Sequence, residues 1–326
     1  GNACRRGGDF RQPGAGANRW SDQSVFSEIF TRQFVTANGV DLCVTIGGDG
    51  PPLVLLHGFP QTHVIWHRMA PVLAQKFTLI MPDLRGYGDS AAPPGDAEHQ
   101  HYSKREMARD IVALVDHFGF DRFALAGHDR GGRVAYRLAL DHPGRVTRLC
   151  AIDIIPTLDV WEDMDAAATV SAFHWSLLAA SAPLPEQLIG QNPDLFYGAL
   201  LRRWAGDFDK LDAAAIAAYL RQYRDPAGIH AQCEDYRAGA SVDLDNDRIS
   251  RDAGEQLQCP VLLLWGTGYL SDKAKSPASS WRKWAREVSE VAIDCGHFVV
   301  EEEPEIAARA MLEFFDDPGL AAKRSA

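Results

Sequence analysis

Short apolar runs bounded by glycine, proline and polar residues recur along the chain, and such runs are typical of buried strands. Eight of them stand out, at 33–37, 40–46, 52–56, 77–81, 123–127, 148–154, 261–265 and 288–293. The first two flank Asn38-Gly39, a dipeptide that favours a tight hairpin turn. The sequence therefore predicts eight strands, of which the first two form a hairpin.

Apolar residues at helical spacing fill most of the intervals between these runs. The clearest stretch is Ser103–Phe118, where Ser103 and Glu106 form a capping box. From about 156 to 249 the chain carries alanine-rich and aromatic helical stretches without a convincing strand. Further helices are predicted at 66–75, from the turn after 128 to about 140, at 281–287 and after Pro304.

The alternation of strands and helices predicts an α/β fold with a mostly parallel eight-stranded sheet covered on both faces. The helical block interrupts this alternation after the sixth strand, so we interpret it as an inserted cap. The predicted organisation is a flexible leader over 1–27, a core domain over 28–155 and 251–326, and a helical cap domain over 156–250. Active sites in such sheets lie at the carboxyl ends of the strands.

Composition and charge narrow the classes of partner. The 326 residues are 46% hydrophobic, and their net charge of −11 argues against nucleic acid, which requires a basic face. No run approaches the ~20 apolar residues of a membrane span, so no membrane partner is expected. The six cysteines are scattered without a Cys-x-x-Cys pair, which favours free thiols and a cytoplasmic location. No metal or organic cofactor is indicated.

The segment Gly127–Arg133 has the form Gly-x-nucleophile-x-Gly, in which a nucleophile lies on a sharp turn between a strand and a helix. Asp129 occupies the position that serine takes in hydrolases acting on esters. A carboxylate attacks saturated carbon and leaves an ester behind, so the candidate bonds are carbon–halogen bonds and epoxides. Asp129 alone would fit an ordinary helix N-cap, but the flanking glycines and the preceding strand favour a nucleophile.

A histidine after the last strand extends the predicted catalytic set. His297 follows the run 288–293 and would be the general base for the water that cleaves the enzyme ester. A catalytic histidine needs a carboxylate to orient it, and three aspartates could do so. Asp153, at the end of the sixth strand, is favoured over Asp272 in the next strand's loop and over Asp294 beside the histidine.

Two arginines adjoin the predicted nucleophile. Arg130 and Arg133 are three residues apart, so they project from neighbouring parts of one helix face. A cation in the first turn of a helix is disfavoured by about 0.3–1 kcal/mol, and an anion bound there would explain it. A guanidinium matches a carboxylate in bidentate fashion, whereas the alternative is a solvated surface pair. By position, the backbone N–H groups of Phe59 and Arg130 form the predicted oxyanion hole.

Together these motifs resemble the fluoroacetate (haloacetate) dehalogenases of the α/β-hydrolase fold. The resemblance runs from about residue 35 to 315. The segments that carry it are 57–63 (HGFPQTH), 127–133 (GHDRGGR), 149–156 (LCAIDIIP), 173–176 (FHWS), 233–240 (CEDYRAGA) and 296–298 (GHF). The Asp-Arg-x-x-Arg elbow and the His-Trp pair are specific, whereas His-Gly-Phe-Pro and the elbow glycines are shared with epoxide hydrolases.

The resemblance implies that Asp129 displaces halide from the alpha carbon of a small haloacid while Arg130 and Arg133 hold the acid's carboxylate. His297 with Asp153 then hydrolyses the ester. The resemblance further implies that the leaving halide is bound by His174, Trp175 and Tyr236. Imidazole, indole and phenol can each donate a hydrogen bond, although each residue alone would fit a packed aromatic of the cap.

Two other functions fit parts of the sequence. An epoxide hydrolase would use the same nucleophile and two cap tyrosines, for which the candidates are Tyr197, Tyr219, Tyr223 and Tyr236. An uncharged epoxide, however, gives no reason for Arg130. A non-catalytic receptor for small acids is the third hypothesis, and the apparently complete Asp–His–Asp set argues against it. By analogy with the fold, we expect a homodimer.

Overall fold

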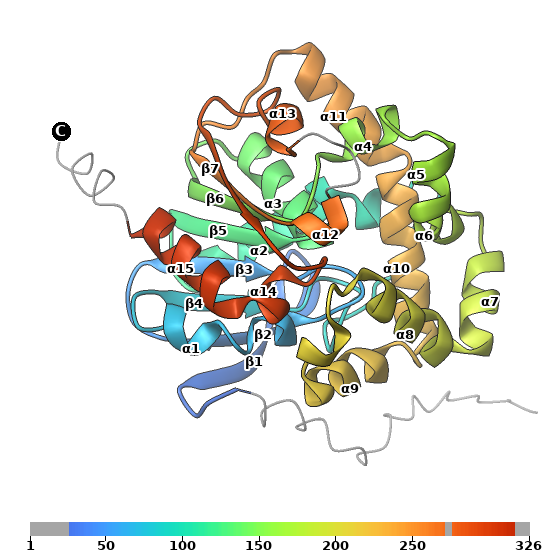
Figure 1. The fold of residues 1–326 in the computed structure, drawn as a ribbon, viewed down its shortest axis with the longest axis horizontal. Helices are drawn as coiled ribbons and strands as arrows, with labels where there is room; N and C mark the ends of the chain where they lie inside the picture. Colours follow the sequence, from blue (N-terminus) through green and yellow to red (C-terminus); the bar gives the residue numbers. More distant parts are fainter. Residues whose placement is uncertain (1–25, 271–275, 317–326) are drawn as a thin grey trace, which may run out of the picture.

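The computed structural model describes residues 26–270 and 276–316. Asp272 and all but the last two residues of the predicted leader lie outside these ranges. Its centre is one eight-stranded sheet in the order β1-β2-β4-β3-β5-β6-β7-β8 (Figure 1). β2 pairs antiparallel with β1 and β4, and all other neighbours are parallel. The strands are β1 (Phe30–Ala37), β2 (Val40–Gly47), β3 (Pro52–Leu56), β4 (Thr78–Pro82), β5 (Phe123–His128), β6 (Val146–Ile152), β7 (Val261–Gly266) and β8 (Val288–Ile293).

The predicted mostly parallel sheet of eight strands is therefore confirmed, with shifts at several strand ends. β3 and β8 begin and end at the predicted residues. β6 stops at Ile152, two residues before the predicted end, because Asp153 takes a left-handed backbone conformation with φ 54°. Such a φ cannot continue a strand. The Asn38-Gly39 hairpin is confirmed, with both residues at positive φ.

Helices cover both faces of the sheet, as predicted, and create two apolar cores. Alternate residues of β3 serve the two cores, so the strand is buried on both sides. One face packs against α2 and α3, and the other packs against α1 and α15 (Figure 1). The core helices are α1 (Ala70–Leu73), α2 (Lys104–His117), α3 (Arg130–Asp141), α12 (Thr267–Leu270), α13 (Ala278–Trp281), α14 (Val299–Glu302) and α15 (Pro304–Phe315).

Helix ends follow local chemistry. The hydroxyl of Ser103 accepts the Glu106 N–H at 3.2 Å, which confirms the predicted start of α2. The single helix predicted over 66–75 is wrong, because a 3₁₀ turn ends at Trp66 and α1 begins at Ala70. Pro71 has no N–H to continue a helix from the preceding turn. The helix predicted over 281–287 lies earlier in the chain, where α13 (Ala278–Trp281) ends at the first predicted residue.

Eight helices lie between β6 and β7 within residues 157–252, all of which are described. They gather along one side of the sheet (Figure 1), and we refer to them as the cap helices. They are α4 (Thr157–Glu162), α5 (Ala166–Ser171), α6 (Phe173–Leu178), α7 (Leu184–Gln191), α8 (Pro193–Trp204), α9 (Ala213–Gln222), α10 (Pro226–Gly239) and α11 (Val242–Asp252).

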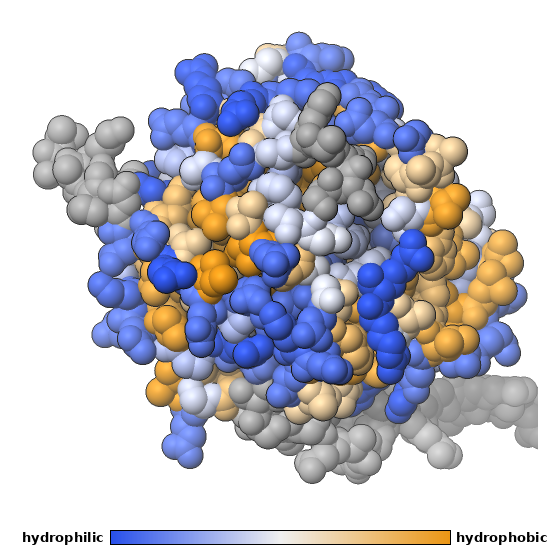
Figure 2. Space-filling model, in the orientation of Figure 1, coloured by the Kyte–Doolittle hydropathy of each residue, from blue (hydrophilic) through white to orange (hydrophobic). Residues whose placement is uncertain are grey.

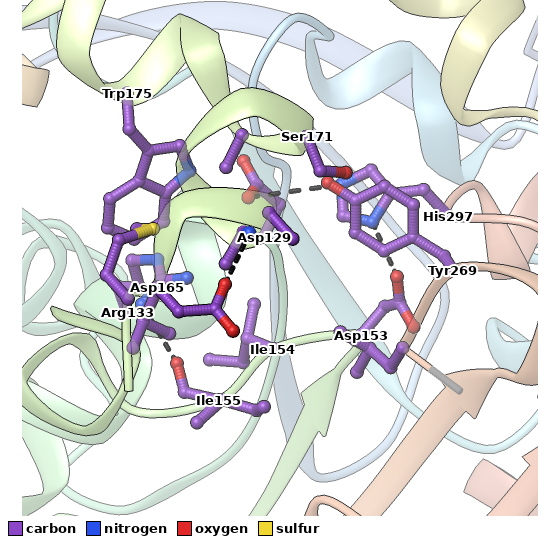
Figure 3. A pocket seen from close by; sticks show the side chains of 16 residues that line it. Asp129, Arg133, Asp153, Ile154, Ile155, Asp165, Ser171, Trp175, Tyr269 and His297 are labelled. Carbon is purple, nitrogen blue, oxygen red and sulfur yellow. Dashed lines mark hydrogen bonds and ion pairs between the residues drawn. The ribbon is translucent and has the colours of Figure 1, made fainter. Parts of the chain in front are cut away.

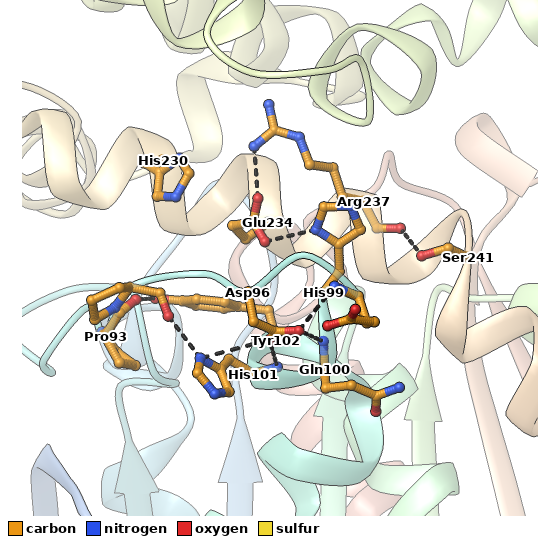
Figure 4. A network of polar contacts seen from close by, with 12 residues as sticks. Pro93, Asp96, His99, Gln100, His101, Tyr102, His230, Glu234, Arg237 and Ser241 are labelled. Atoms are coloured by element: carbon orange, nitrogen blue, oxygen red, sulfur yellow. Dashed lines mark hydrogen bonds and ion pairs between the residues drawn. The ribbon is translucent and has the colours of Figure 1, made fainter.

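Ion pairs fasten α10 to the loop that follows β4 (Figure 4). Glu234 of α10 contacts the His99 ring at 2.8 Å and accepts a bond of 2.8 Å from Arg237 on the same helix. The next residue, the buried Asp235, pairs with Lys104 at the start of α2. Because both contacts cross from core to cap, α10 is held at a fixed place over the carboxyl ends of the strands.

The outer surface is largely polar, with an apolar area over α7 (Figure 2). Leu184 and Leu188, one helical turn apart, are 56% and 55% exposed there. The expected homodimer stays a prediction. Among the described residues, no helix is both long and apolar enough to cross a bilayer.

Candidate active site

The turn between β5 and α3 holds Asp129 in a strained conformation, with φ 46° and ψ −117°. Glycine is required on both sides of it. A Cβ on Gly127 would lie 2.5 Å from the Gly131 carbonyl, and one on Gly131 would lie 2.2 Å from the His57 carbonyl. The Asp129 side chain makes no capping bond to α3, so its carboxylate is aimed away from the helix it precedes. This arrangement disfavours the N-cap interpretation.

The two oxygens of Asp129 have different environments. The Phe59 N–H donates to Oδ1 at 2.9 Å, in the position predicted for the oxyanion hole. No bond from the Arg130 N–H to this carboxylate is present within the described residues, so its part in the oxyanion hole stays a prediction. Oδ2 faces the cavity and lies 3.9 Å from Nε2 of His297. Oδ2 is therefore the oxygen free to attack a substrate.

His297 and Asp153 form a close pair behind the nucleophile. Nδ1 of His297 lies 2.5 Å from Oδ2 of Asp153, and the Gly266 N–H holds the other carboxylate oxygen at 2.8 Å. Nδ1 therefore carries the ring proton, and Nε2 presents its lone pair towards Asp129. Asp294 is exposed, and the structure brings Asp153 to the histidine, as the sequence favoured.

Burial and neighbouring charges set the protonation states at this centre. Burial alone would raise the pKa of Asp129, but its neighbours outweigh that effect and hold the pKa below its usual value; near neutral pH the charges that do so are those of Arg133 and Arg130. Burial lowers the pKa of His297 to about 4. Asp129 is therefore an ionised nucleophile near neutral pH, and His297 is a neutral base.

Asp129, His297 and Arg133 line one cavity of about 290 Å³ between the sheet and the cap helices. Figure 3 shows Arg133 and Trp175 on one side of it, His297 and Tyr269 on the other, and Asp129 between them. On the cap side, the cavity is lined by the larger side chains of Val160, Met164, Asp165 and Trp175 and by four small ones, and it leaves room beyond a two-carbon acid. The small side chains are those of Ala167, Ala168, Ser171 and Ala172, in α5 and at its end.

Both predicted carboxylate-binding arginines are buried, at 0% exposed for Arg130 and 4% for Arg133, which disfavours a solvated surface pair. Arg133 reaches the cavity itself. Its Nη1 donates to the Ile155 carbonyl at 2.9 Å, and its guanidinium lies over the Trp175 ring at 4.6 Å. Its Nε is buried without a hydrogen-bond partner among the residues the model describes. A donor of Arg133 is thus left over for a ligand.

Arg130 is already committed to another partner. Its Nε and Nη2 form a fork on the carboxylate of Asp235, at 3.1 and 2.7 Å, and its guanidinium lies 4.3 Å from the Tyr236 ring centre. Only its Nη1 is buried and unpaired within the described part of the chain. The sequence suggested two equivalent carboxylate forks, whereas the structure shows one arginine in the cavity and one beneath it.

The three predicted halide-binding residues come together from α6 and α10. The ring centre of Tyr236 lies 5.8 Å from that of His174 and 6.1 Å from that of Trp175. Nδ1 of His174 is buried without a hydrogen-bond partner in the described residues. Burial lowers the pKa of His174 to about 3, so its ring is neutral. The cluster can therefore offer neutral N–H and O–H donors.

Sequence reasoning missed three residues of this site. Tyr269 in α12 lines the cavity, with its ring centre 4.3 Å from that of His297. The ring centre of Trp204, at the end of α8, lies 4.6 Å from that of His174, and the Trp204 backbone carbonyl accepts the His297 backbone N–H at 2.8 Å. Asp235 is the partner of Arg130. The sequence offers one signal for these, since Asp235 directly precedes Tyr236.

His57 and His128 are engaged in hydrogen bonds within the fold. The Leu84 N–H donates to Nε2 of His57 at 3.0 Å, and Nε2 of His128 contacts the His297 carbonyl at 2.8 Å. Cys43, Cys150, Cys233, Cys259 and Cys295 are buried, and no disulfide joins them to one another.

Comparison with known proteins identifies the family. The family model of the alpha/beta hydrolase fold matches residues 51–304. The chain belongs to this family and is a hydrolase of its fold. Within this family, the chain is 42% identical to a fluoroacetate dehalogenase from Burkholderia sp., and the match covers 89% of this chain and 95% of the relative. This similarity confirms the resemblance seen in the sequence.

Other relatives carry a different activity in their names. A soluble epoxide hydrolase from Corynebacterium sp. (strain C12) is 34% identical, with 85% of this chain and 94% of that one covered. A solved structure, described as a candidate α/β hydrolase from Nostoc sp PCC 7120, has a TM-score of 0.86 at 42% identity. The match covers 88% of this chain and 98% of that one. The comparisons therefore establish the hydrolase family and leave two classes of reaction open.

Proposed function

We propose that the protein is a hydrolytic dehalogenase of short 2-haloacids, converting fluoroacetate or chloroacetate and water to glycolate, halide and a proton. The observation that carries the proposal is the set of unpaired buried donors around Asp129. Arg133 Nε, Arg130 Nη1 and His174 Nδ1 lack partners among the described residues. Leaving such groups unpaired costs about 1–3 kcal/mol each. All three atoms are closed off from solvent, so a small anion would relieve that cost where a side chain turns towards the cavity, as Arg133 at the cavity wall can.

Two ends of a haloacetate match two sets of these donors. Its carboxylate would pair with the guanidinium of Arg133 at the cavity wall, and Arg130 beneath the cavity would add positive charge without lining it. Its halogen would face His174, Trp175 and Tyr236. Fluoride is a poor leaving group, so hydrogen bonds that strengthen as charge develops on the halogen would lower the barrier.

The first chemical step would be attack of Asp129 Oδ2 on the alpha carbon, with departure of halide and formation of an ester. Oδ1 then becomes the ester carbonyl oxygen and already lies 2.9 Å from the Phe59 N–H. His297 would take a proton from water as that water attacks the Asp129 carboxyl carbon. The ester carbon–oxygen bond then breaks and releases glycolate, and the Asp129 carboxylate is regenerated.

A halide-release panel tests the proposal directly. The purified protein is incubated separately with fluoro-, chloro- and bromoacetate, and with an uncharged chloroalkane of similar size. We expect halide from the acids and little from the alkane, because only the acids satisfy the arginine donors. Release from the chloroalkane at the rate of chloroacetate, or no release from any acid, would remove this function.

A further inference from the structure

The tyrosine hydroxyls divide into committed and free groups. Six of the eight are accounted for within the fold: those of Tyr87, Tyr102, Tyr136, Tyr197 and Tyr219 are hydrogen-bonded, and that of Tyr223 is sealed in the interior. The other two belong to Tyr236 and Tyr269. Neither has a hydrogen-bond partner within the described residues, and neither is among the atoms closed off from solvent.

Tyr236 packs against His174 and Trp175, of which only Trp175 lines the cavity, at the end of the site to which the proposed function assigns the leaving group. Burial and the charge of Asp129 raise its pKa, so it carries its proton near neutral pH. The Arg130 guanidinium lies 4.3 Å from the centre of its ring, where a cation would stabilise a phenolate. Neutral imidazole and indole N–H groups are much weaker acids, so Tyr236 is the group of this cluster that can give up a proton.

A leaving halide needs hydrogen bonds but no proton, whereas a leaving alkoxide needs a proton. A dehalogenase therefore does not need the proton that the Tyr236 phenol can donate. Uncharged epoxides leave the arginines unexplained, but an epoxide that carries a carboxylate would use both features. The cavity of about 290 Å³ and the small side chains of α5 leave room for the third carbon.

We propose that this site also opens small 2,3-epoxy acids, the oxirane-2-carboxylates, with Tyr236 as the proton donor. The carboxylate would bind at Arg133, as for the haloacid of the proposed function, with which this activity shares its nucleophile. Oδ2 of Asp129 attacks the ring carbon beside the carboxylate and forms an ester. The bond from that carbon to the ring oxygen breaks, and the oxygen takes the Tyr236 proton.

Water activated by His297 then cleaves the ester. The sum is one oxirane-2-carboxylate and one water giving one 2,3-dihydroxypropanoate, with the Tyr236 phenolate reprotonated from solvent. Tyr269 faces the same cavity from the His297 side, opposite the Tyr236 cluster, so the proton to the ring oxygen is assigned to Tyr236 alone.

Three substrates, each given separately to the same protein, test this inference: oxirane-2-carboxylate, chloroacetate and propylene oxide. We expect the epoxy acid to yield 2,3-dihydroxypropanoate and propylene oxide to be turned over at least about 100-fold less efficiently, because it lacks the carboxylate. If chloroacetate is hydrolysed and the epoxy acid is not, the inference is overturned while the dehalogenase stands. The reverse result overturns the dehalogenase and supports the inference. Equal turnover of propylene oxide overturns the role given to the carboxylate.

Tyr236→Phe separates proton donation from hydrogen bonding. Loss of a general acid costs about 10²–10⁴-fold, so kcat/KM for the epoxy acid should fall at least about 100-fold. Chloroacetate keeps two of its three halide donors and should lose about tenfold. Tyr102→Phe removes a buried hydroxyl outside the cavity and serves as the matched control. Equal losses for both substrates in Tyr236→Phe would contradict the assigned role.

A second measurement covers the case in which Tyr236→Phe does not fold. His297→Asn should trap an ester on Asp129 from either substrate, and intact mass followed by peptide mapping would locate it. An adduct from chloroacetate but none from the epoxy acid would again overturn the inference.

Discussion

The core half and the cap half of the site differ in how far their polar groups are satisfied. In the core half, Asp129, Asp153 and His297 are joined to each other and to backbone N–H groups at 2.5–3.9 Å. In the cap half, His174, Trp175 and Tyr236 pack as aromatic rings, and their N–H and O–H groups lack partners among the described residues. The core half is thus assembled without a ligand, whereas under the proposed function a bound ligand would supply the partners that the cap half lacks.

This difference indicates which half of the site sets the type of reaction and which half selects the substrate. A preassembled nucleophile and base fix the two-step chemistry, whatever leaves the carbon. Under the proposed function, the unpaired donors of the cap and the adjoining arginines would select the leaving group and the anion. Substitutions in the core half should therefore affect all substrates alike, whereas those in the cap half should affect them unequally.

Asp129→Asn gives the largest expected effect. An amide is a poor nucleophile, so halide release from every haloacid should fall about 10⁴-fold or more. The measurement is initial halide release at saturating chloroacetate. Asp294→Asn makes the same chemical change on an exposed carboxylate near His297 and should stay close to wild type. Residual activity within tenfold of wild type would show that another group attacks the carbon.

His297→Asn should stop turnover without stopping the first step. Alkylation of Asp129 does not require the base, so the variant should release a single burst of halide and then stall, with steady turnover lowered about 10³-fold or more. Intact mass with chloroacetate should show a stable adduct on Asp129. If turnover stops and no adduct forms, hydrolysis does not proceed through an ester.

The core half was the part predictable from sequence. Asp129 lies within a local strand–turn–helix motif, and Asp153 and His297 follow apolar runs that end at the same edge of a parallel sheet. The fork from Arg130 to Asp235 joins residues 105 positions apart, and no periodicity encodes that contact. Tyr269 was missed because it lies in a short helix after β7 that carries no amphipathic pattern.

Trp175→Phe should separate the halogens. The change removes one donor to the leaving halide while keeping an aromatic ring under Arg133. A hydrogen bond to a charged group contributes about 1.5–3 kcal/mol, so kcat for fluoroacetate should fall about 100-fold. Bromide leaves readily without such help, and its loss should be under about tenfold. Equal losses for fluoroacetate and bromoacetate would place the halide away from Trp175.

Lysine at each arginine position tests whether the two arginines are equivalent. Arg133→Lys should raise KM for chloroacetate about tenfold and lower the free energy of unfolding less than Arg130→Lys does, because Arg133 faces the cavity and has no ion-pair fork of its own to lose. Arg130→Lys should lower the free energy of unfolding by about 1–3 kcal/mol, because it breaks the buried fork on Asp235. Arg282→Lys, at an exposed position, is the matched control. Equal effects of the two changes on KM and on thermal unfolding would contradict this division.

The smallest predicted effect is the pH dependence, and it comes from the core half alone. The first step needs ionised Asp129, whose pKa is lowered, and the second needs neutral His297, whose pKa is about 4. Both active forms are present above these pKa values and are lost as the pH falls through them. Once Asp129 is esterified its charge disappears, and with it an interaction that raises the pKa of His297. The base therefore stays neutral in the intermediate as well.

Activity on chloroacetate should accordingly change by no more than about twofold between pH 8 and pH 5.5 and should decline only below that range. An ordinary histidine, with a pKa near 6.5, would lose about 90% of its neutral form by pH 5.5. The profile should be measured for both kcat and kcat/KM, with circular dichroism at each pH to exclude unfolding. An acid limb centred near 6.5 would mean that water reaches His297 in the working enzyme, and that the core half is less closed than its contacts indicate.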